Sequence, residues 1–509
     1  MSGLGFFSDK RNYLIFGVCL PFAILLGYHL ADINDPVSKF VFAAAIAGLC
    51  SPLLIRWYHP LLVLSWNMTA QVAFLPGAPL LWSFLSLVGM FFAILNRSLN
   101  PDNKLSLVPS LTLPLTFFAG VILVTAEITG GINISTFGAT ASQGGRKYFY
   151  VLAAIVGFFG LTSMSISKNK AYLYVMVFYL SGLTTMLNLL PAWIGPAGDF
   201  IYYFFPGEIS DPFVQTQSEV IGERRIGEMM APSFAIFSWM LARYGIRGVF
   251  DLAKPFKLIL FLGAISLGFL GGFRSHLIMV ALTFGILFFV ERLWRTQVML
   301  IVAVMGTLLG IALLTSADKL PPTVQRCFSF LPIGIDPVIK MQAESSSQWR
   351  IDLWTQVIEE VPVYLFKGKG YSFSTDDMYM ALFNQNNMGA AGSAQGAAVA
   401  GDYHNGPLSL LIPFGIYGLI AFIWLVIAGS FYLYKNYQFG DPELRTINAF
   451  LFACFTARVI FFFIIFGAIS SDLYVFTGIL GLSVALNARK KPEPLPEGAL
   501  GLQDAIARS

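Results

Sequence analysis

The chain has 509 residues, and its composition excludes a soluble globular protein. Hydrophobic residues make up 56% of it, charged residues only 12%, and the mean hydropathy is +0.70. A soluble domain needs far more charge on its surface, so the composition predicts an all-α, polytopic transmembrane helix bundle. The net charge of +4 is not accompanied by a basic stripe with interleaved aromatic residues, and it gives no indication of nucleic-acid binding.

The apolar segments are numerous and evenly spread along the chain. A membrane-spanning helix needs about 20 mainly apolar residues, and by that criterion we expect about fourteen spans. They lie near residues 13–31, 38–55, 60–76, 79–96, 107–127, 148–167, 171–190, 231–249, 257–273, 275–291, 298–316, 406–434, 447–466 and 470–487. Arg458 interrupts the apolar run at 447–466, so the stretch 447–487 also fits a shorter hairpin.

The basic residues between the spans agree with this count. With both termini in the cytoplasm, the basic clusters of the short connections fall on the cytoplasmic side, as the positive-inside rule requires. These clusters contain Lys10, Arg11, Arg56, Arg97, Lys104, Lys168, Lys170, Arg243, Arg247, Lys254, Lys257, Arg292, Arg295, Lys435, Arg489, Lys490 and Lys491. The outer side then receives residues 191–230, the turn at Arg274, and residues 317–405.

Five regions follow from this topology. They are N-terminal transmembrane helices (1–127), core transmembrane helices with an outer loop at 191–230 (128–316), a large, partly helical outer loop (317–405), C-terminal transmembrane helices (406–487) and a cytoplasmic tail (488–509). Within the large loop, the Gly- and Ala-rich stretch 387–401 is expected to form a mobile flap.

One of the four histidines, His404, ends the large outer loop just before the span that opens at Gly406. An imidazole that titrates near neutrality can take a proton from a hydroxyl nucleophile. Asp402 is close enough in sequence to orient the ring, and Asn405 follows it directly. A lone loop histidine is more often structural than catalytic, but the position at a membrane boundary, with arginines on the same side, favours a catalytic role.

Arginines on the outer side are candidate ligands for an anion. Arg224 and Arg225 precede the span at 231–249, and Arg274 follows two glycines where the next outer helix begins. A guanidinium is always charged and offers a fork of donors that suits a phosphate or diphosphate, and a helix N-terminus adds to such a site. Arg224 and Arg225 also fit an ion-pair network with nearby glutamates, and Arg274 also fits an interfacial anchor.

The large outer loop contains a predicted amphipathic helix over Ser347–Ile358, ended by Pro362. Arg350 and Trp354 lie one turn apart on it. Its apolar stripe consists of Trp349, Leu353 and Val357. A helix of this kind can lie flat on a membrane surface with its tryptophans at headgroup depth, so the segment also fits a simple anchor.

Arg458 is a separate candidate, because it lies in the middle of the apolar run Leu451–Phe466. An arginine is costly in lipid and usually faces the bundle or a water-filled cavity. Asp472, near the outer end of the next span, is its candidate partner. A structural ion pair is at least as good an interpretation as a functional one.

Several of these residues fall in short motifs that follow one another along the chain. The motifs are Arg224 with Gly227 and Pro232, Phe273-Arg274-Ser275, Arg350 with Trp354, Gly368-Lys369-Gly370, His404-Asn405 with Leu408, and Gly415-Ile416-Tyr417-Gly418. In this order, and on one side of the membrane, they resemble the core of the O-antigen ligase and polymerase superfamily.

Members of that superfamily take a glycan from an undecaprenyl diphosphate carrier at the periplasmic face of the bacterial inner membrane. They pass it to another glycan or to lipid A core, without a metal ion or another cofactor. The resemblance implies that His404 activates the acceptor hydroxyl. It also implies a substrate-binding set of Arg224, Arg225, Arg274, Arg350 and Asn405, supported by Trp354 and Asp402.

The resemblance leaves several alternatives open. Gly406-Pro407 follows Asn405 where the family often has Ser or Thr, and Arg224 has Arg225 as a competing neighbour. The additional N-terminal spans favour a polymerase of surface polysaccharide over a ligase. The partners would be the lipid-linked donor, a glycan or lipid A-core acceptor, membrane lipid and a chain-length regulator. A transporter of lipid-linked oligosaccharides and a structural subunit of a secretion machine are the rival functions.

Overall fold

The computed structural model describes residues 20, 21, 23, 24, 27, 36–75, 77–99, 106–130, 144–206, 225–371, 397–398 and 401–488. The regular elements among these residues are helices, and a single isolated β-bridge joins Gln71 to Leu80. Seven of the described helical segments are long and apolar enough to cross a membrane. The all-helical, multi-pass class is therefore confirmed. The total of about fourteen spans and the side on which each terminus lies stay predictions.

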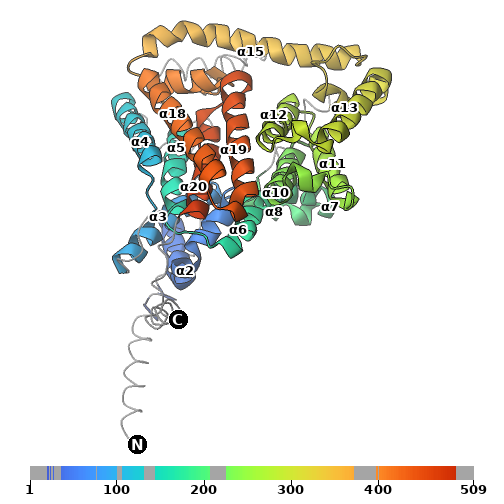
Figure 1. The fold of residues 1–509 in the computed structure, drawn as a ribbon. Coiled ribbons are helices and arrows are strands. Elements are labelled where there is room, and N and C mark those ends of the chain that lie inside the picture. The colour runs from blue at the N-terminus through green and yellow to red at the C-terminus, as the bar shows by residue number, and fades with distance from the viewer. Residues whose placement is uncertain are drawn as a thin grey trace, which may run out of the picture.

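The helices form two neighbouring groups beneath one long helix, α15 (Pro337–Tyr364) (Figure 1). One group contains α4 (Pro109–Thr129), α5 (Gly144–Leu161), α18 (Gly406–Phe439), α19 (Arg445–Ile460) and α20 (Ile469–Asn487). The other contains α10 (Met230–Val249), α11 (Pro255–Phe269), α12 (Arg274–Val290) and α13 (Gln297–Ser316). The two groups meet where α10 and α12 pack against α19.

The remaining elements are shorter or lie at the edge of the bundle. The helices are α2 (Pro36–Ser65), α3 (Leu81–Leu99), α6 (Lys168–Leu180), α7 (Leu190–Ile194), α8 (Phe200–Phe204) and α14 (Pro322–Cys327). The 3₁₀ segments are η2 (Ser181–Leu189), η3 (Pro196–Gly198), η5 (Gly227–Met229), η6 (Leu293–Arg295), η7 (Ala317–Lys319) and η8 (Pro442–Leu444). A π-helical turn, η9 (Phe461–Ile465), follows α19.

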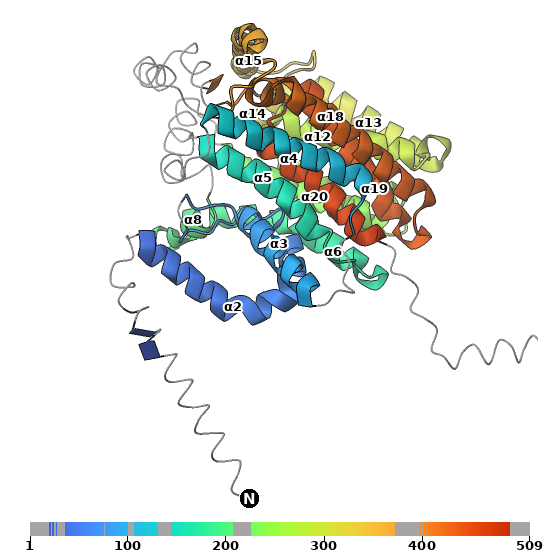
Figure 2. The same cartoon turned by 90° about the vertical axis from the view of Figure 1, so that its left-hand side faces the viewer.

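The N-terminal part differs from the expected pattern of spans. The two segments expected at 38–55 and 60–76 are replaced by the single helix α2, which bends sharply (Figure 2). Pro52 and Pro60 lie inside this helix. Each proline lacks a backbone donor and crowds the preceding turn, which accounts for the bend. Hydropathy alone assigns two spans because it does not register that the helix continues through its prolines.

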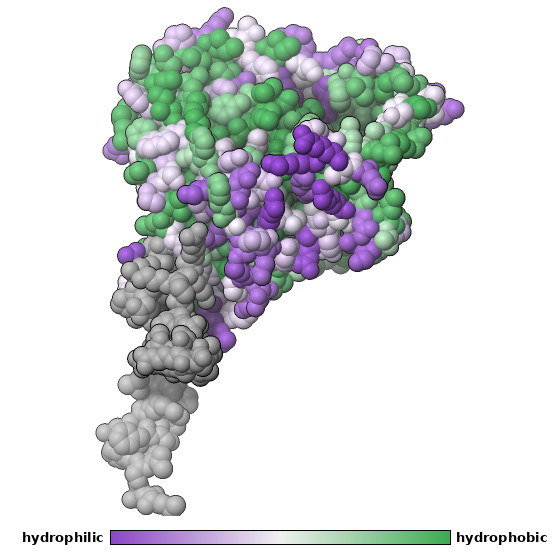
Figure 3. Space-filling view, in the orientation of Figure 1, coloured by the Kyte–Doolittle hydropathy of each residue, from purple (hydrophilic) through white to green (hydrophobic). Residues whose placement is uncertain are grey.

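α15 lies across one end of the bundle, which we call the α15 end (Figures 1 and 2). Hydrophobic residues cover both upper flanks, around α18 and α13, and hydrophilic residues gather in the middle of the front face (Figure 3). Only 6% of the apolar window around α13 is buried. Its side chains therefore point outward, as expected for a helix surrounded by lipid.

Close packing in the core depends on glycines that face a buried tryptophan. Trp66 is 1% exposed and donates from Nε1 to the carbonyl oxygen of Tyr474 at 3.0 Å. A Cβ atom added at Gly478 would lie 2.0 Å from that Nε1, and one at Gly157 would lie 2.6 Å from the same indole. Small residues let membrane helices approach closely, so this tryptophan locks the end of α2 between α5 and α20.

Gly478→Ala is expected to destabilise the protein, because the added methyl group collides with an indole that its hydrogen bond holds in place. Overpacking of this kind costs about 1–3 kcal/mol. Gly285→Ala in α12 is the matched control, since nothing lies within 4 Å of its added Cβ atom. Thermal unfolding in detergent measures both variants. A wild-type midpoint for Gly478→Ala would contradict the packing described.

Candidate functional site

The helix predicted in the large loop exists and is longer than expected. It extends from Pro337 to Tyr364 as α15, and the Asp336 side chain caps its start by accepting a hydrogen bond from the Val338 amide at 2.7 Å. The prediction that Pro362 ends the helix is wrong, because this residue lies inside the last turn. Because only two helical residues follow Pro362, the hydrogen bond lost at this proline weakens only the end of the helix.

The apolar stripe of α15 faces the protein. Leu353 and Val357 are fully buried against Tyr403, Leu408 and Ile412. This confirms the stripe predicted from the sequence and identifies what it contacts: the first turns of α18 and the segment that leads into them. The burial of these two side chains holds the helix against the bundle through the hydrophobic effect.

The two tryptophans of α15 contact the segment that carries His404. Trp354 donates from Nε1 to the carbonyl oxygen of Tyr403 at 2.9 Å, and Trp349 packs edge-on against the His404 ring at 5.3 Å. Both also pack against the small cluster beneath α15. We therefore interpret these side chains as positioning residues for the Tyr403 backbone and the His404 ring, in place of lipid anchors.

His404 adopts a backbone conformation that is unusual for its residue type, with φ at +50°. Residues with a Cβ atom rarely occupy this left-handed region, and they do so where neighbouring structure holds them. Here the ring lies between Trp349 and Phe466, whose centroid is 5.1 Å away. On the following residue, the Asn405 side chain caps α18 by accepting from the Leu408 amide at 3.0 Å. A substrate contact by Asn405 stays a prediction.

The charges around His404 make it a neutral base. Burial lowers the pKa of its imidazole, and the positive charges of Arg350 and Lys147 lower it further. The Asp402 carboxylate acts in the opposite direction. A ring with a depressed pKa is unprotonated at neutral pH and can accept a proton from a hydroxyl group.

Asp402 forms a hydrogen-bonded ion pair with Lys147, the fourth residue of α5, at 2.8 Å. The Lys147 side chain is only 13% exposed, and its ammonium nitrogen lies 5.7 Å from the centre of the Tyr371 ring. Asp402 therefore acts on His404 through its charge. The sequence analysis missed Lys147, although its place next to Arg146 at the outer start of an expected span was a usable signal.

Arg274 and Arg350 converge beneath α15. Arg274, at the start of α12, donates to the carbonyl oxygen of Ala343 at 3.0 Å and to Oγ of Ser347 at 3.1 Å. Burial lowers the pKa of Arg350, and the neighbouring charge of Arg274 lowers it further. The Arg350 guanidinium carbon is 5.8 Å from the centre of the Phe466 ring, the ring that also packs against His404. Two arginines and the histidine thus share one region at the α15 end.

The remaining predicted arginines lie at the edge of this region or outside the described residues. Arg225 runs beside the turn before α12, because a Cβ atom at Gly272 would lie 3.5 Å from its Cδ. Gly272 has a φ of +66°, a conformation that favours glycine. Arg225 therefore approaches the turn that carries Arg274. Arg224 falls outside the described residues, as does most of the expected flap at 387–401.

The motifs Gly368-Lys369-Gly370 and Gly415-Ile416-Tyr417-Gly418 belong to one joint, by which we mean the contact between the turn after α15 and the break in α18. α18 is interrupted at Gly415, which has a φ of +63° and follows Pro413. The turn after α15 supplies the missing donors: the Lys369 amide bonds the Ile412 carbonyl oxygen at 2.7 Å, and the Gly370 amide bonds that of Pro413 at 2.9 Å. These motifs therefore fasten the end of α15 to the break in α18.

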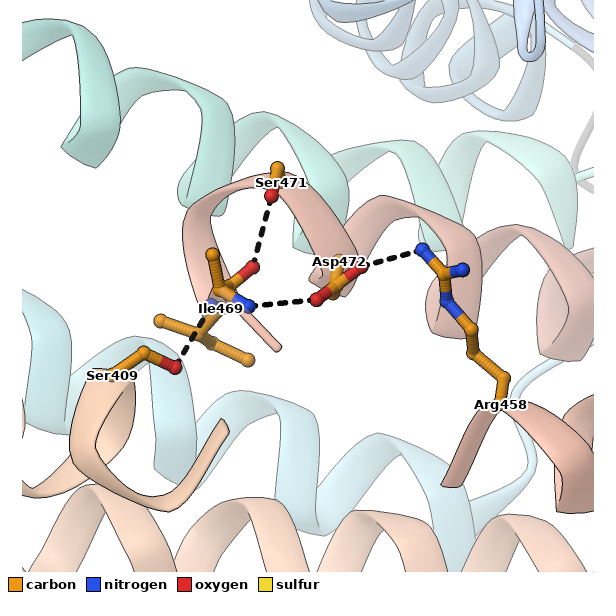
Figure 4. A network of polar contacts seen from close by, with 6 residues as sticks. Ser409, Arg458, Ile469, Ser471 and Asp472 are labelled. Carbon is orange, nitrogen blue, oxygen red and sulfur yellow. Dashed lines mark hydrogen bonds and ion pairs between the residues drawn. The ribbon is translucent and has the colours of Figure 1, made fainter. Parts of the chain in front are cut away.

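Arg458 and Asp472 form the ion pair expected from the sequence, at 2.5 Å (Figure 4). The second carboxylate oxygen of Asp472 accepts from the Ala468 amide at 2.8 Å, and the Ile469 amide donates to Oγ of Ser409 at 3.1 Å. This network fixes the start of α20 against α18 and α19.

Comparison with known proteins agrees with the motifs. Residues 258–423 match the sequence model of a family described as O-antigen ligase. The matched segment extends from α11 into α18 and contains Arg274, Arg350 and His404. No curated protein matches the chain.

The fold and the site together define a multi-pass membrane protein with a cationic and basic site at one end of its helix bundle. The resemblance to the O-antigen ligase and polymerase superfamily is confirmed for residues 258–423, the segment that matches the family model. Members of this family are membrane enzymes that transfer glycosyl groups.

The charges around His404 allow a titration test. Lys147→Met should raise the pKa of His404, because it removes a positive charge that opposes protonation, and Asp402→Asn should lower it, because it removes a carboxylate that favours the imidazolium. NMR titration of ¹³C-labelled histidine, with the resonance assigned through His404→Gln, measures both shifts. Shifts of the same sign in the two variants would contradict this arrangement.

Proposed function

We propose that the protein is a glycosyltransferase that moves a glycan from an undecaprenyl diphosphate carrier to the hydroxyl of an acceptor glycan. The reaction takes place at the periplasmic face of the bacterial inner membrane and needs no metal ion. The observation that carries this proposal is the grouping of Arg274, Arg350 and His404 at the α15 end: Arg274 is hydrogen-bonded to α15 and its charge acts on Arg350, while Arg350 and His404 both contact the Phe466 ring.

The arginines fit the leaving group. When the bond between the anomeric carbon and the carrier breaks, its electron pair remains on the diphosphate, whose negative charge grows. Guanidiniums that are already in place stabilise this charge in the transition state. Arg274 is held by its two bonds to α15, and Arg350 is half-buried beside it. The pKa of Arg350 is lowered, but an arginine remains charged at neutral pH.

His404 fits the acceptor. The acceptor oxygen forms a bond to the anomeric carbon and gives its proton to the imidazole, while the diphosphate leaves on the opposite side with inversion. A neutral imidazole is required for this step, which agrees with the depressed pKa of His404. Lys147 and Asp402 act as positioning residues, because they set the electrostatic environment of the base.

We favour polymerisation of a surface polysaccharide or O-antigen over ligation to lipid A core, on the ground of the additional N-terminal helices. α2 and α3 precede the segment that matches the family. A charged residue inside a span is the feature that would favour a transporter, and the ion pair of Arg458 with Asp472 supports a structural role for this one. Partners would be the lipid-linked donor, the acceptor glycan and a chain-length regulator.

His404→Ala should abolish transfer, because general-base catalysis contributes about 10²–10⁴-fold to such reactions. Lipid-linked donor should accumulate in cells that carry the variant, and analysis of lipid-linked sugars together with surface polysaccharide measures it. Single repeats on the acceptor would indicate a polymerase, and full-length polymer left on the carrier would indicate a ligase. Normal glycan transfer by His404→Ala would refute the proposed role of the base.

A matched pair of variants on α15 tests the contact with the diphosphate. Arg350→Gln should lower the transfer rate by at least about tenfold, because charge-assisted contacts to a diphosphate contribute on the order of 1.5–3 kcal/mol. Lys340→Gln changes charge by the same amount at an exposed position of the same helix and should leave the rate unchanged. Purified protein with a short-chain prenyl diphosphate glycan provides the assay. Equal rates for both variants would contradict the contact.

A further inference from the structure

A cavity separate from the residues of the proposed site is lined in part by Arg458, Ser470 and Ser471. Its volume is about 460 Å³, and it is lined by residues from the end of α2, the start of α3, and α5, α6, α10, α19 and α20. The proposed reaction does not use it. Its lining combines aromatic rings with hydroxyl groups and one guanidinium, a composition that differs from that of a groove filled by lipid.

Aromatic rings form one wall of this cavity. Trp82 stacks on Tyr474 with centroids 4.9 Å apart and planes inclined by 21°. Trp66 and Tyr150 flank Trp82 at centroid distances of 5.6 Å and 5.9 Å. The faces of such rings carry partial negative charge, so they attract the polarised C–H groups on the face of a sugar ring.

Six polar side chains lie among the apolar residues of the lining. They are Asn67, Thr69, Thr185, Arg458, Ser470 and Ser471. One nitrogen of Arg458 binds Asp472, while its buried Nε donates to no acceptor among the residues that the structure describes. A buried donor left unpaired is destabilising, and a hydroxyl of a bound ligand would satisfy it. Because Arg458 is already neutralised by Asp472, the arrangement suits an uncharged ligand rich in hydroxyl groups.

The cavity is connected to the proposed site through a short aromatic path. The Arg458 guanidinium carbon is 5.8 Å from the centre of the Phe461 ring, and that ring is 6.5 Å from Phe466, which packs against His404. Phe234 lines the cavity and packs against Phe461 as well. On this path the rings of Phe461 and Phe466 lie between Arg458, in the lining of the cavity, and the base.

We propose that this cavity is a subsite for an uncharged pyranose ring of the glycan, an inference that rests on the proposed function. The half-buried rings of Tyr150 and Tyr474 would take the face of the sugar, since Trp66 and Trp82 are only 1% and 3% exposed. The hydroxyl groups and the Nε of Arg458 would bond its edge. The pyranose belongs either to the donor repeat unit or to the end of the acceptor, and both offer the same chemistry.

Ser471 provides the direct test, because it lines the cavity and is exposed, which places it at the opening. Ser471→Phe should obstruct the opening, and Ser471→Ala is the matched control that removes only the hydroxyl. The probe is the free one-repeat oligosaccharide, released by hydrolysis from the surface polysaccharide of the producing cell. Its affinity for the detergent-purified protein, measured by saturation-transfer NMR, should fall at least about tenfold for Ser471→Phe and less than about threefold for Ser471→Ala.

The double variant Arg458→Met with Asp472→Asn covers the case in which Ser471→Phe does not fold. It removes both buried charges together and keeps an oxygen at residue 472 for the Ala468 amide. It should also weaken binding of the oligosaccharide, because the Nε donor is lost. Wild-type affinity in a folded Ser471→Phe protein, or in the folded double variant, would overturn the assignment.

Steady-state transfer with two substrates identifies the source of the pyranose. A KM for the acceptor that rises in Ser471→Phe, with an unchanged KM for the donor, assigns the cavity to the acceptor, and the reverse assigns it to the donor. Unchanged values of both would overturn the proposal. Failure of the proposed function can be told apart from failure of the subsite. In the first case transfer no longer depends on His404, while oligosaccharide still binds in an assay without turnover.

Discussion

The attachment of α15 to the broken helix α18 is the constraint on which the candidate site depends. The break at Gly415 leaves the carbonyl oxygens of Ile412 and Pro413 without helical donors, and the turn at 368–370 supplies them. Leu353 and Val357 add a buried apolar contact along the same helix. α15 carries Arg350 and the two tryptophans beside His404. Loss of this joint would therefore separate Arg350 from the base, even with every side chain of the site still present.

Parts of this arrangement follow from the sequence and parts do not. The stripe on α15 was predictable because helical spacing fixes which residues share a face. Its partner was not, since an apolar face that meets lipid headgroups has the same spacing as one that meets protein. The spacing therefore left a membrane anchor open for Trp349 and Trp354, whereas the structure shows them in contact with the segment at Tyr403 and His404. Lys147 was missed because its partner lies 255 residues away along the chain.

The motif residues divide into two kinds. Gly368, Gly370 and Gly415 have positive φ and meet backbone or side-chain atoms closely, so they maintain the joint. Arg350 and His404 contact a shared ring, Arg274 lies beside Arg350, and the three carry the proposed chemistry. A resemblance in sequence cannot separate these kinds, because a motif gives residue types and spacing but no contacts. Only the contacts of each residue tell a structural glycine from a reactive side chain.

The charges around His404 also imply a coupling between ligand and proton. In the protein alone, Arg350 and Lys147 hold the proton affinity of the imidazole down. An anionic carrier that binds the arginines would cancel part of this field, so the imidazole would become more basic when donor is present. By thermodynamic reciprocity, protonation of the imidazole and retention of the anion favour each other. Departure of the diphosphate would then help the ring to release the proton it has taken, which resets the base for the next cycle.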